Sequence, residues 1–283
     1  MTTALLFPGQ GSQTSSMREL VGDEAPELLA ELIERIGEDP FPRVAECTAY
    51  AQPAIYCASI AGLRRMRPEI PAAYAGHSMG EITALAAAGA LSVEEGLRLV
   101  IVRASAMAAA ASQMGGSMLA LLKGELPQVA ELAGAHGATV ANDNAPGQIV
   151  ASGPVAALDA LAADARAHGL RVMRLDVAGA FHSRAMAPAL ERFGAALDSV
   201  EFSEPSAPVY SGLTARPFDN VREELLASLV SCVRWRETMV ALHRAGADDF
   251  VDLGPGEVLA RLVARNVPGA GARTLEGSDA LHA

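Results

Sequence analysis

The spacing of apolar and polar residues along the chain predicts short buried strands that alternate with amphipathic helices. An apolar run at residues 3–7 ends at Pro8-Gly9, a turn signal, and a similar short run occupies residues 72–75. The helical period of apolar residues predicts helices at residues 23–36, 52–66, 81–90 and 93–113. Strands that alternate with helices indicate a mainly parallel sheet that is covered on both faces.

A different pattern occupies the middle of the chain, residues 117–177. It reads as a strand, a helix, two short strands around a turn, a second helix and a final strand. This βαββαβ order is typical of a ferredoxin-like unit. We therefore expect a small subdomain that is inserted into a larger α/β body.

The pattern of the larger body resumes after this insertion. The expected elements are helices at 185–200, 221–233 and 235–245 and strands within 207–215 and 248–254. The stretch after Gly269 is rich in glycine and alanine, and we expect it to be loose.

Composition and charge narrow the functional classes. Hydrophobic residues make up 51% of the 283 residues, which is ample for a core, and charged residues only 19%. A formal net charge of −11 argues against broad nucleic-acid binding, because such proteins must neutralise phosphates. The first residues do not resemble a signal peptide, and no apolar run is long enough to span a bilayer. The three cysteines show no CxxC spacing, so neither a disulfide framework nor a metal site is expected. We expect a soluble, cytoplasmic protein.

The first candidate catalytic motif is Gly76-His77-Ser78-Met79-Gly80, which matches G-x-S-x-G between an expected strand and an expected helix. On such an elbow the glycines avoid clashes, so the serine adopts a strained backbone and exposes its Oγ. The helix that follows directs free N–H groups and its positive dipole end at the site. A packed junction with an incidental serine is the alternative, but the strand–turn–helix context favours a nucleophile.

A serine nucleophile needs a base, and the histidines can be sorted by position. His77 adjoins the serine, so its side chain should point away and brace the elbow. His182 lies at a strand-to-helix corner where the small subdomain returns the chain to the body. It is the remaining candidate for the base, although a lone histidine can equally be structural. The other histidines lie at expected helix ends or in the tail: His136, His168, His243 and His282.

The stretch "FPGQGSQ", residues 7–13, places a glycine-rich loop directly after a buried strand. A loop of this kind can offer backbone N–H groups to a developing oxyanion near a nucleophile elbow. A phosphate-binding loop is rejected, because no Gly-Lys-Ser/Thr follows.

Three motifs in this order, "FPGQGSQ", "GHSMGE" and "GAFHS", closely resemble the malonyl-CoA:acyl-carrier-protein transacylase family. That family includes fatty-acid-synthase enzymes, the acyltransferase domains of polyketide synthases and discrete trans-acting versions. Further matches such as "AQPAIYCAS", "NDNAPGQIVASG" and "DLGPGEVLARL" run nearly the length of the chain. The resemblance implies a hydrolase-like body, residues 1–115 and 180–283, with an inserted ferredoxin-like subdomain at 116–179.

The resemblance also implies a role for individual residues. Ser78 corresponds to the acylated nucleophile and His182 to the general base and acid. The backbone N–H groups of Gln10 and Met79 would form the oxyanion hole. Arg103 matches the family's arginine that pairs with the malonyl carboxylate, which suits a guanidinium because it binds carboxylates in a bidentate way.

Other matching positions concern selectivity and support. Phe181 resembles the bulky residue of malonyl-selective members, where a smaller residue makes room for an α-methyl group. Gln52, Asn142 and Asn144 match positions near the site, and with His77 they complete the expected set, although each amide could equally be structural.

The sequence departs from the family at the amide that helps to orient the histidine. Ser228 stands at the apparent match, so either Ser228 or a backbone carbonyl is expected to orient His182.

These inferences predict a ping-pong acyltransferase of fatty-acid or polyketide biosynthesis. It would move malonyl from malonyl-CoA to the phosphopantetheine thiol of an acyl carrier protein, as a monomer and without a cofactor. An acidic carrier would require local arginines such as Arg184 or Arg216. The alternatives are an acyl-carrier acyl hydrolase, the acyltransferase subunit of malonate decarboxylase, an acyltransferase for an unusual 2-substituted malonyl unit, and a non-catalytic scaffold.

Overall fold

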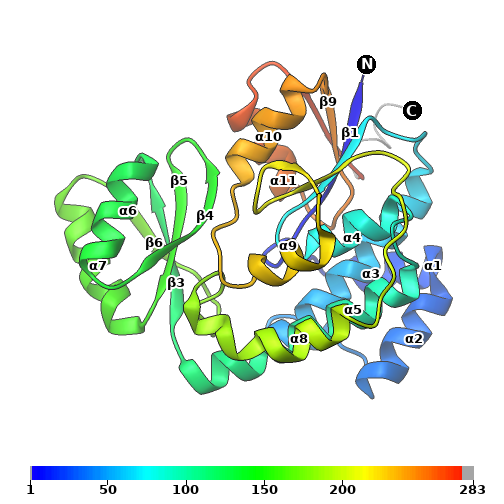
Figure 1. Ribbon diagram of the computed structural model, residues 1–283, viewed down its shortest axis with the longest axis horizontal. Helices are drawn as coiled ribbons and strands as arrows, with labels where there is room; N and C mark the ends of the chain where they lie inside the picture. The colour runs from blue at the N-terminus through cyan, green and yellow to red at the C-terminus, as the bar shows by residue number, and fades with distance from the viewer. Residues whose placement is uncertain (1, 276–283) are drawn as a thin grey trace.

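The computed structural model describes residues 2–275 and contains two separate sheets (Figure 1). The larger sheet has the strand order β10-β9-β1-β2-β7-β8. All neighbouring strands in it are parallel except β7 and β8, as expected for strands that are connected through helices. Its strands are β1 (Thr3–Phe7), β2 (Ala73–Gly76), β7 (Val209–Ser211), β8 (Arg216–Pro217), β9 (Asp249–Asp252) and β10 (Gly271–Thr274).

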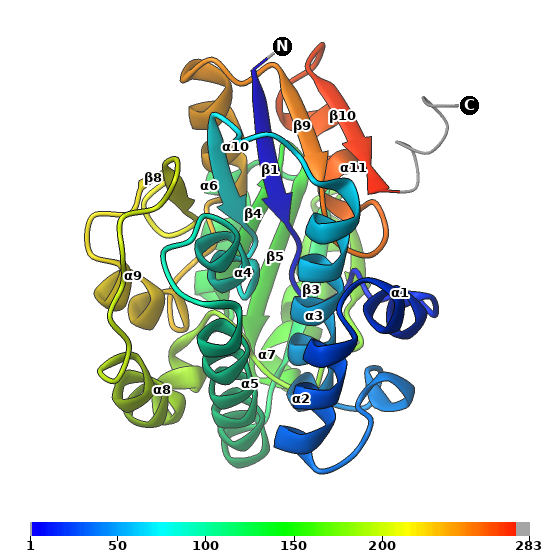
Figure 2. The same ribbon diagram turned by 90° about the vertical axis from the view of Figure 1, so that its right-hand side faces the viewer.

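Helices cover both faces of the larger sheet. Successive residues of β1 accordingly face one helical layer and then the other, and so belong to two hydrophobic cores. Leu5 and Phe7 pack with helices α3 to α5, which lie on the near side of the sheet in Figure 2. Ala4 and Leu6 pack with α10 and α11 on the opposite face. The helices of the body are α1 (Met17–Glu24), α2 (Pro26–Ile36), α3 (Thr48–Met66), α4 (Gly80–Ala87), α5 (Val93–Met114), α8 (Leu190–Leu197), α9 (Val221–Ser228), α10 (Trp235–Arg244) and α11 (Val258–Asn266).

The smaller sheet is antiparallel with the order β4-β5-β3-β6. Two helices cover its outer face, where Leu119 and Leu121 pack with Leu158, while Met118 and Val150 face the body. The order of elements and the strand order are those of a ferredoxin-like unit. Its elements are β3 (Ser117–Leu122), α6 (Leu126–Ala135), β4 (Thr139–Ala145), β5 (Gln148–Gly153), α7 (Val155–Ala167) and β6 (Arg171–Arg174). The expected fold class is therefore confirmed.

Two sequence expectations are wrong in detail. The single helix expected at residues 23–36 is two helices, because Ala25 leaves the helical region at φ −149° and Pro26 starts a new helix at its first turn. The stretch after Gly269 is not loose up to Thr274, because β10 pairs with β9 and Arg273 Nη2 lies 2.5 Å from Asp249 Oδ2.

Smaller differences concern element ends. The helix expected from residue 185 begins as a 3-10 turn, Arg184–Ala189, and the helix expected to reach residue 233 ends at Ser228. In residues 2–275 there is no helix that is both long and apolar enough to cross a membrane.

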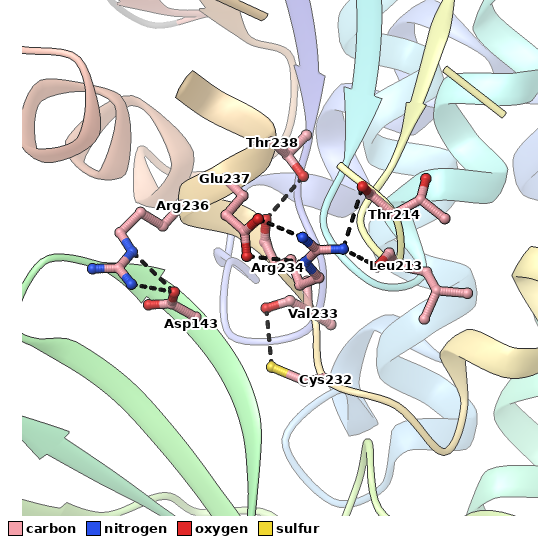
Figure 3. A network of polar contacts seen from close by, with 9 residues as sticks. All are labelled: Asp143, Leu213, Thr214, Cys232, Val233, Arg234, Arg236, Glu237 and Thr238. Carbon is pink, nitrogen blue, oxygen red and sulfur yellow. Dashed lines mark hydrogen bonds and ion pairs between the residues drawn. The ribbon is translucent and has the colours of Figure 1, made fainter. Parts of the chain in front are cut away.

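The segment between α9 and α10 ties the two sheets together (Figure 3). Val233 forms a short parallel pairing with β4: its N–H donates to the carbonyl of Ala141 (2.8 Å), and its carbonyl accepts from the N–H of Asp143 (2.9 Å). The N–H of Arg234 donates to the carbonyl of Gly212, just past β7 (2.7 Å). Residues 232–234, at the end of this segment, are called the clasp below.

An ion pair reinforces the clasp from α10. Arg236 Nε and Nη2 each lie 2.9 Å from Asp143 Oδ2 (Figure 3). The Asp143 side chain is only 2% exposed, and its Oδ1 has no hydrogen-bond partner in the described residues. Burial raises the pKa of Asp143, although Arg236 acts in the opposite direction. Arg236 therefore compensates the charge of the buried Asp143 carboxylate.

Replacing Arg236 by Met should lower the free energy of unfolding by about 2 kcal/mol, because it leaves the buried Asp143 charge without its partner. Urea unfolding measures this change. Arg244→Met, on the exposed side of the same helix, is the matched control and should change stability little. Adding Asp143→Asn to Arg236→Met should recover part of the loss, and equal destabilisation by the two arginine variants would contradict the role of the ion pair.

Candidate active site

Ser78 lies on a tight turn between β2 and α4. Its backbone is in the left-handed region, at φ 56°. A Cβ on Gly76 would overlap the backbone of Gly80, and a Cβ on Gly80 would overlap the carbonyl oxygen of Phe7. Glycine is therefore required at both positions, and the turn presents Ser78 at the C-terminal edge of the sheet.

His182 contacts this serine through one ring nitrogen and the backbone through the other. Its Nε2 lies 2.8 Å from Ser78 Oγ, and its Nδ1 lies 2.9 Å from the carbonyl oxygen of Ser228. A carbonyl can only accept, so Nδ1 carries the hydrogen and Nε2 accepts the Ser78 proton. The Ser228 hydroxyl does not take part, since it donates to the carbonyl of Leu225 (2.8 Å). Of the two orienting groups considered from sequence, the structure places the backbone carbonyl against the histidine.

The surroundings keep His182 neutral. Burial, together with the nearby charge of Arg103, lowers the pKa of His182 to about 3. The Ser228 carbonyl opposes this shift only in part. At neutral pH the imidazole is thus in the form that can accept a proton.

Arg103 reaches the serine from α5 and is 2% exposed. Its Nη2 donates to Ser78 Oγ (3.0 Å) and its Nη1 to Gln52 Oε1 (2.6 Å). Among residues 2–275 no carboxylate lies within ion-pair distance of it. Burial lowers the pKa of Arg103 to about 10, with the charge of Glu81 acting in the opposite direction. The guanidinium stays charged at neutral pH, and its environment favours an added anion.

Two backbone N–H groups that lack a protein acceptor within residues 2–275 belong to residues near the serine. Met79 directly precedes the first residue of α4, and Gln10 lies in the glycine-rich loop after β1. In the described part of the chain neither backbone N–H has a protein acceptor. Both residues line the same cavity as Ser78, so their N–H groups are available to an oxyanion formed there.

His77 points to the small subdomain rather than to the base. Its Nε2 lies 2.8 Å from Asn144 Oδ1, and its ring packs on Trp235 at a centroid distance of 5.3 Å. Asn142 Nδ2 lies 3.5 Å from the same nitrogen. Burial lowers the pKa of His77. These contacts join the elbow to β4.

A cavity of about 400 Å³ lies between the two sheets and collects the candidate residues. It is lined by Gln10, Gln52, His77, Ser78, Met79, Arg103, Asn142, Asn144, Phe181 and His182. The small subdomain contributes Met118 and Val150 to its wall. His136, His168, His243, Arg184 and Arg216 are not in its lining, and His282 lies outside the described residues.

Two buried polar residues near the site were not singled out from sequence. Glu81, the first acidic residue of α4, accepts the N–H of Gly212 at 2.7 Å, and burial raises its pKa to about 7. Thr48, the first residue of α3, hydrogen-bonds Gln52 and Gln10. A single charged residue in helix α4 is a sequence signal for Glu81, but a threonine at a helix start gives no such signal for Thr48.

The chain is similar in sequence and in overall fold to known proteins. The family model described as the acyl transferase domain matches residues 42–274. A malonyl CoA-acyl carrier protein transacylase of Synechocystis is 37% identical, over 100% of this chain and 99% of its own length. A polyketide biosynthesis malonyl CoA-acyl carrier protein transacylase of Bacillus velezensis is 34% identical, over 92% and 95%. The crystal structure of a malonyl-CoA:acyl carrier protein transacylase of Xanthomonas oryzae is similar with a TM-score of 0.92 and 34% identity, over 99% and 97% of the two chains.

The lowered pKa of His182 predicts how the reactivity of Ser78 depends on pH. Because His182 stays neutral above its pKa, it can accept the serine proton at every pH from 8 down to 5. The rate at which phenylmethanesulfonyl fluoride labels Ser78, followed by mass spectrometry, should therefore be nearly constant over this range.

A loss of labelling with a midpoint near the ordinary histidine pKa would contradict this prediction. Ser78→Ala controls for labelling elsewhere. Glu81→Gln separates the two titrating groups, since an inflection near pH 7 that disappears in this variant belongs to Glu81.

Proposed function

The chain belongs to the acyl transferase family, and on this basis we propose that it transfers a malonyl group from malonyl-CoA to an acyl carrier protein. The observation that carries the proposal is the buried Arg103, charged and without a carboxylate partner in the described residues, beside Ser78 and His182. The relatives named above are transacylases of this specificity, and the chain aligns with the first of them over its whole length.

The first half-reaction acylates Ser78. His182 Nε2 accepts the proton of Ser78 Oγ while Oγ attacks the thioester carbonyl carbon of malonyl-CoA. The carbonyl oxygen becomes an oxyanion, which the N–H groups of Gln10 and Met79 stabilise. Collapse of this intermediate breaks the carbon–sulfur bond. The departing CoA thiolate takes the proton from His182, and a malonyl ester remains on Ser78.

The second half-reaction reverses these roles. The phosphopantetheine thiol of the carrier gives its proton to His182 and attacks the ester carbonyl, through the same oxyanion hole. Ser78 Oγ leaves and takes the proton back. The reaction as proposed needs no metal or redox cofactor, because serine and imidazole supply the nucleophile and the proton transfer.

Arg103 gives the reaction its selectivity for a dicarboxylic acyl group. A free carboxylate in the cavity would replace Ser78 Oγ as the acceptor of the guanidinium, in a charge-assisted and bidentate contact. A neutral acyl chain would leave this buried charge unpaired. The side chain of Phe181 lines the same cavity and limits the room beside the acyl α-carbon, which favours malonyl over 2-substituted malonyl units.

The role proposed for Arg103 also distinguishes among the alternative functions. An acyl hydrolase would gain nothing from Arg103, whereas a malonate decarboxylase subunit that loads malonyl on a carrier would use the same residues. We propose that the protein acts as a monomer, because the nucleophile, the base and the buried arginine already line one cavity of this chain. The three unpaired cysteines, Cys47, Cys57 and Cys232, support a reducing, cytoplasmic location.

Incubation with malonyl-CoA should add the mass of one malonyl group to the wild-type protein and none to Ser78→Ala, because Ser78 is the group acylated. Intact-protein mass spectrometry measures this addition. Ser152→Ala is a matched control, since Ser152 is buried, lines no part of the cavity and has an unpartnered hydroxyl within residues 2–275.

Labelling that persists in Ser78→Ala would contradict the proposal. Steady release of CoA in the absence of carrier protein, at the rate seen with carrier, would instead favour the hydrolase.

Arg103→Met should lower kcat/KM for malonyl-CoA on the order of 100-fold, because a charge-assisted bidentate contact is lost. The rate with acetyl-CoA should fall much less, so the preference for malonyl should shrink. The measurement is CoA release with malonyl-CoA, methylmalonyl-CoA or acetyl-CoA, each as the sole donor in a separate reaction. An equal loss with all three would assign Arg103 to the general architecture of the site and not to the carboxylate.

A further inference from the structure

Three hydrogen bonds connect Arg103 to the glycine-rich loop, and both line the same cavity. Arg103 Nη1 donates to Gln52 Oε1 (2.6 Å), and Gln52 Nε2 donates to Thr48 Oγ1 (2.7 Å). Thr48 Oγ1 then donates to Gln10 Oε1 (2.7 Å). Thr48 and Gln52 are 6% and 2% exposed, so the bonds of Arg103 to Gln52 and of Gln52 to Thr48 are shielded from water.

The direction of this chain is set by its first member. A guanidinium has donors only, so Gln52 must turn its oxygen toward Arg103 and its amide nitrogen toward Thr48. The Thr48 hydroxyl accepts that bond and keeps one proton, which it donates to Gln10. Each side chain thus has a single orientation that satisfies its partners. The hydrogen bonds therefore link the position of the Arg103 guanidinium to that of the Gln10 side chain, through Gln52 and Thr48.

Both ends of the chain belong to the proposed machinery. Arg103 also donates to Ser78 Oγ, at 3.0 Å. Gln10 lies in a loop outside any helix or strand, next to Gly11 at φ 105°. Side-chain hydrogen bonds hold this loop, including that of Ser12 Oγ to the carbonyl of Gly9 (2.8 Å). Thr48 anchors it from outside, and so affects where the backbone N–H of Gln10 points.

We propose that Thr48 is a positioning residue that couples carboxylate binding at Arg103 to the oxyanion hole at Gln10. The inference rests on the proposed function. When a carboxylate binds Arg103, the anion sets the position of the guanidinium, and the hydrogen-bond chain transmits that position to the loop. An acyl group without a carboxylate leaves the guanidinium where Ser78 Oγ and Gln52 hold it, so the chain has no shift of Arg103 to transmit. Thr48 therefore contributes to the rate with malonyl more than to the rate with acetyl.

A purely structural role for Thr48, at the start of α3, would affect every substrate alike. Thr48→Val removes the hydroxyl and keeps the shape, whereas Thr48→Ser keeps the hydroxyl. Thr83→Val is the matched control: Thr83 is also buried, and its Oγ1 has no hydrogen-bond partner in the described residues. These three variants separate the hydrogen bonds from the side-chain volume.

The test measures acylation of Ser78 by malonyl-CoA and by acetyl-CoA in rapid-quench experiments. Thr48→Val should slow the malonyl step about tenfold with KM nearly unchanged, because a positioning contact acts on the transition state. The acetyl step should change by less than about twofold. Thr48→Ser and Thr83→Val should match the wild type. In an Arg103→Met background, Thr48→Val should cause no further loss, since the chain is already broken.

Three results would overturn the coupling: equal losses with both substrates, wild-type rates in Thr48→Val, or a full additional loss in the Arg103→Met background. Gln10→Leu keeps the test open if Thr48→Val does not fold, because it breaks the last bond and leaves the backbone N–H in place. It should give the same malonyl-specific loss. Failure of the proposed function is a separate result, since wild-type protein would then not be acylated by malonyl-CoA.

Discussion

The buried charge of Arg103 is the constraint on which the rest of the site depends. Within residues 2–275 it has no carboxylate in ion-pair contact, and its acceptors are Gln52 Oε1 and Ser78 Oγ. Its pKa remains about 10 despite burial, so the charge persists at neutral pH. That charge helps to lower the pKa of His182, which keeps the base neutral, and it favours a ligand that brings its own anion. Arg103 thus adds to the effect of burial in keeping His182 neutral, and in the proposed reaction the same side chain determines the acyl preference.

The Ser228 carbonyl, which orients His182, is consistent with this dependence on the Arg103 charge. The Ser228 carbonyl fixes the tautomer, but a carbonyl dipole stabilises an imidazolium less than a buried carboxylate would. In the proposed reaction the imidazolium forms close to Arg103, where like charges oppose each other. The carboxylate of the acyl group offsets the Arg103 charge at that moment. Selectivity and proton transfer are therefore linked through the same electrostatic field.

The connection from the end of α9 to α10 contacts both the base His182 and the small subdomain. Ser228, the last residue of α9, supplies the carbonyl that holds His182, and the clasp at the other end of the connection pairs Val233 with β4. Strand β4 carries Asn144, which holds His77 beside the nucleophile. The cavity wall from the small subdomain and the base from the body are thus positioned by one continuous segment. The Asp143–Arg236 ion pair fixes that segment at a place where the two sheets meet.

Much of the fold and the core of the candidate site could be predicted from local sequence. The periods of apolar residues indicated the two sheets, and Gly76 and Gly80 indicated the elbow, because only glycine fits where the turn meets β1. Elimination among the histidines left His182 as the candidate base, the family resemblance gave it that role, and the structure brings it to 2.8 Å from Ser78 Oγ. The break at Ala25 was missed, although Pro26 is a local signal for a new helix start.

Other features were decided only by the tertiary structure. Strand β10 carries no apolar run, and it exists because β9 offers an unpaired edge. The carbonyl of Ser228 has no sequence signature, because every residue has one, and only packing brings it to His182. Thr48 is 38 residues from Gln10 in the chain, so their hydrogen bond depends on how α3 packs beside the loop after β1. The sequence by itself determined which groups can react. The tertiary structure decided which backbone groups and buried hydroxyls hold them, because those contacts depend on distance in space and not on residue type.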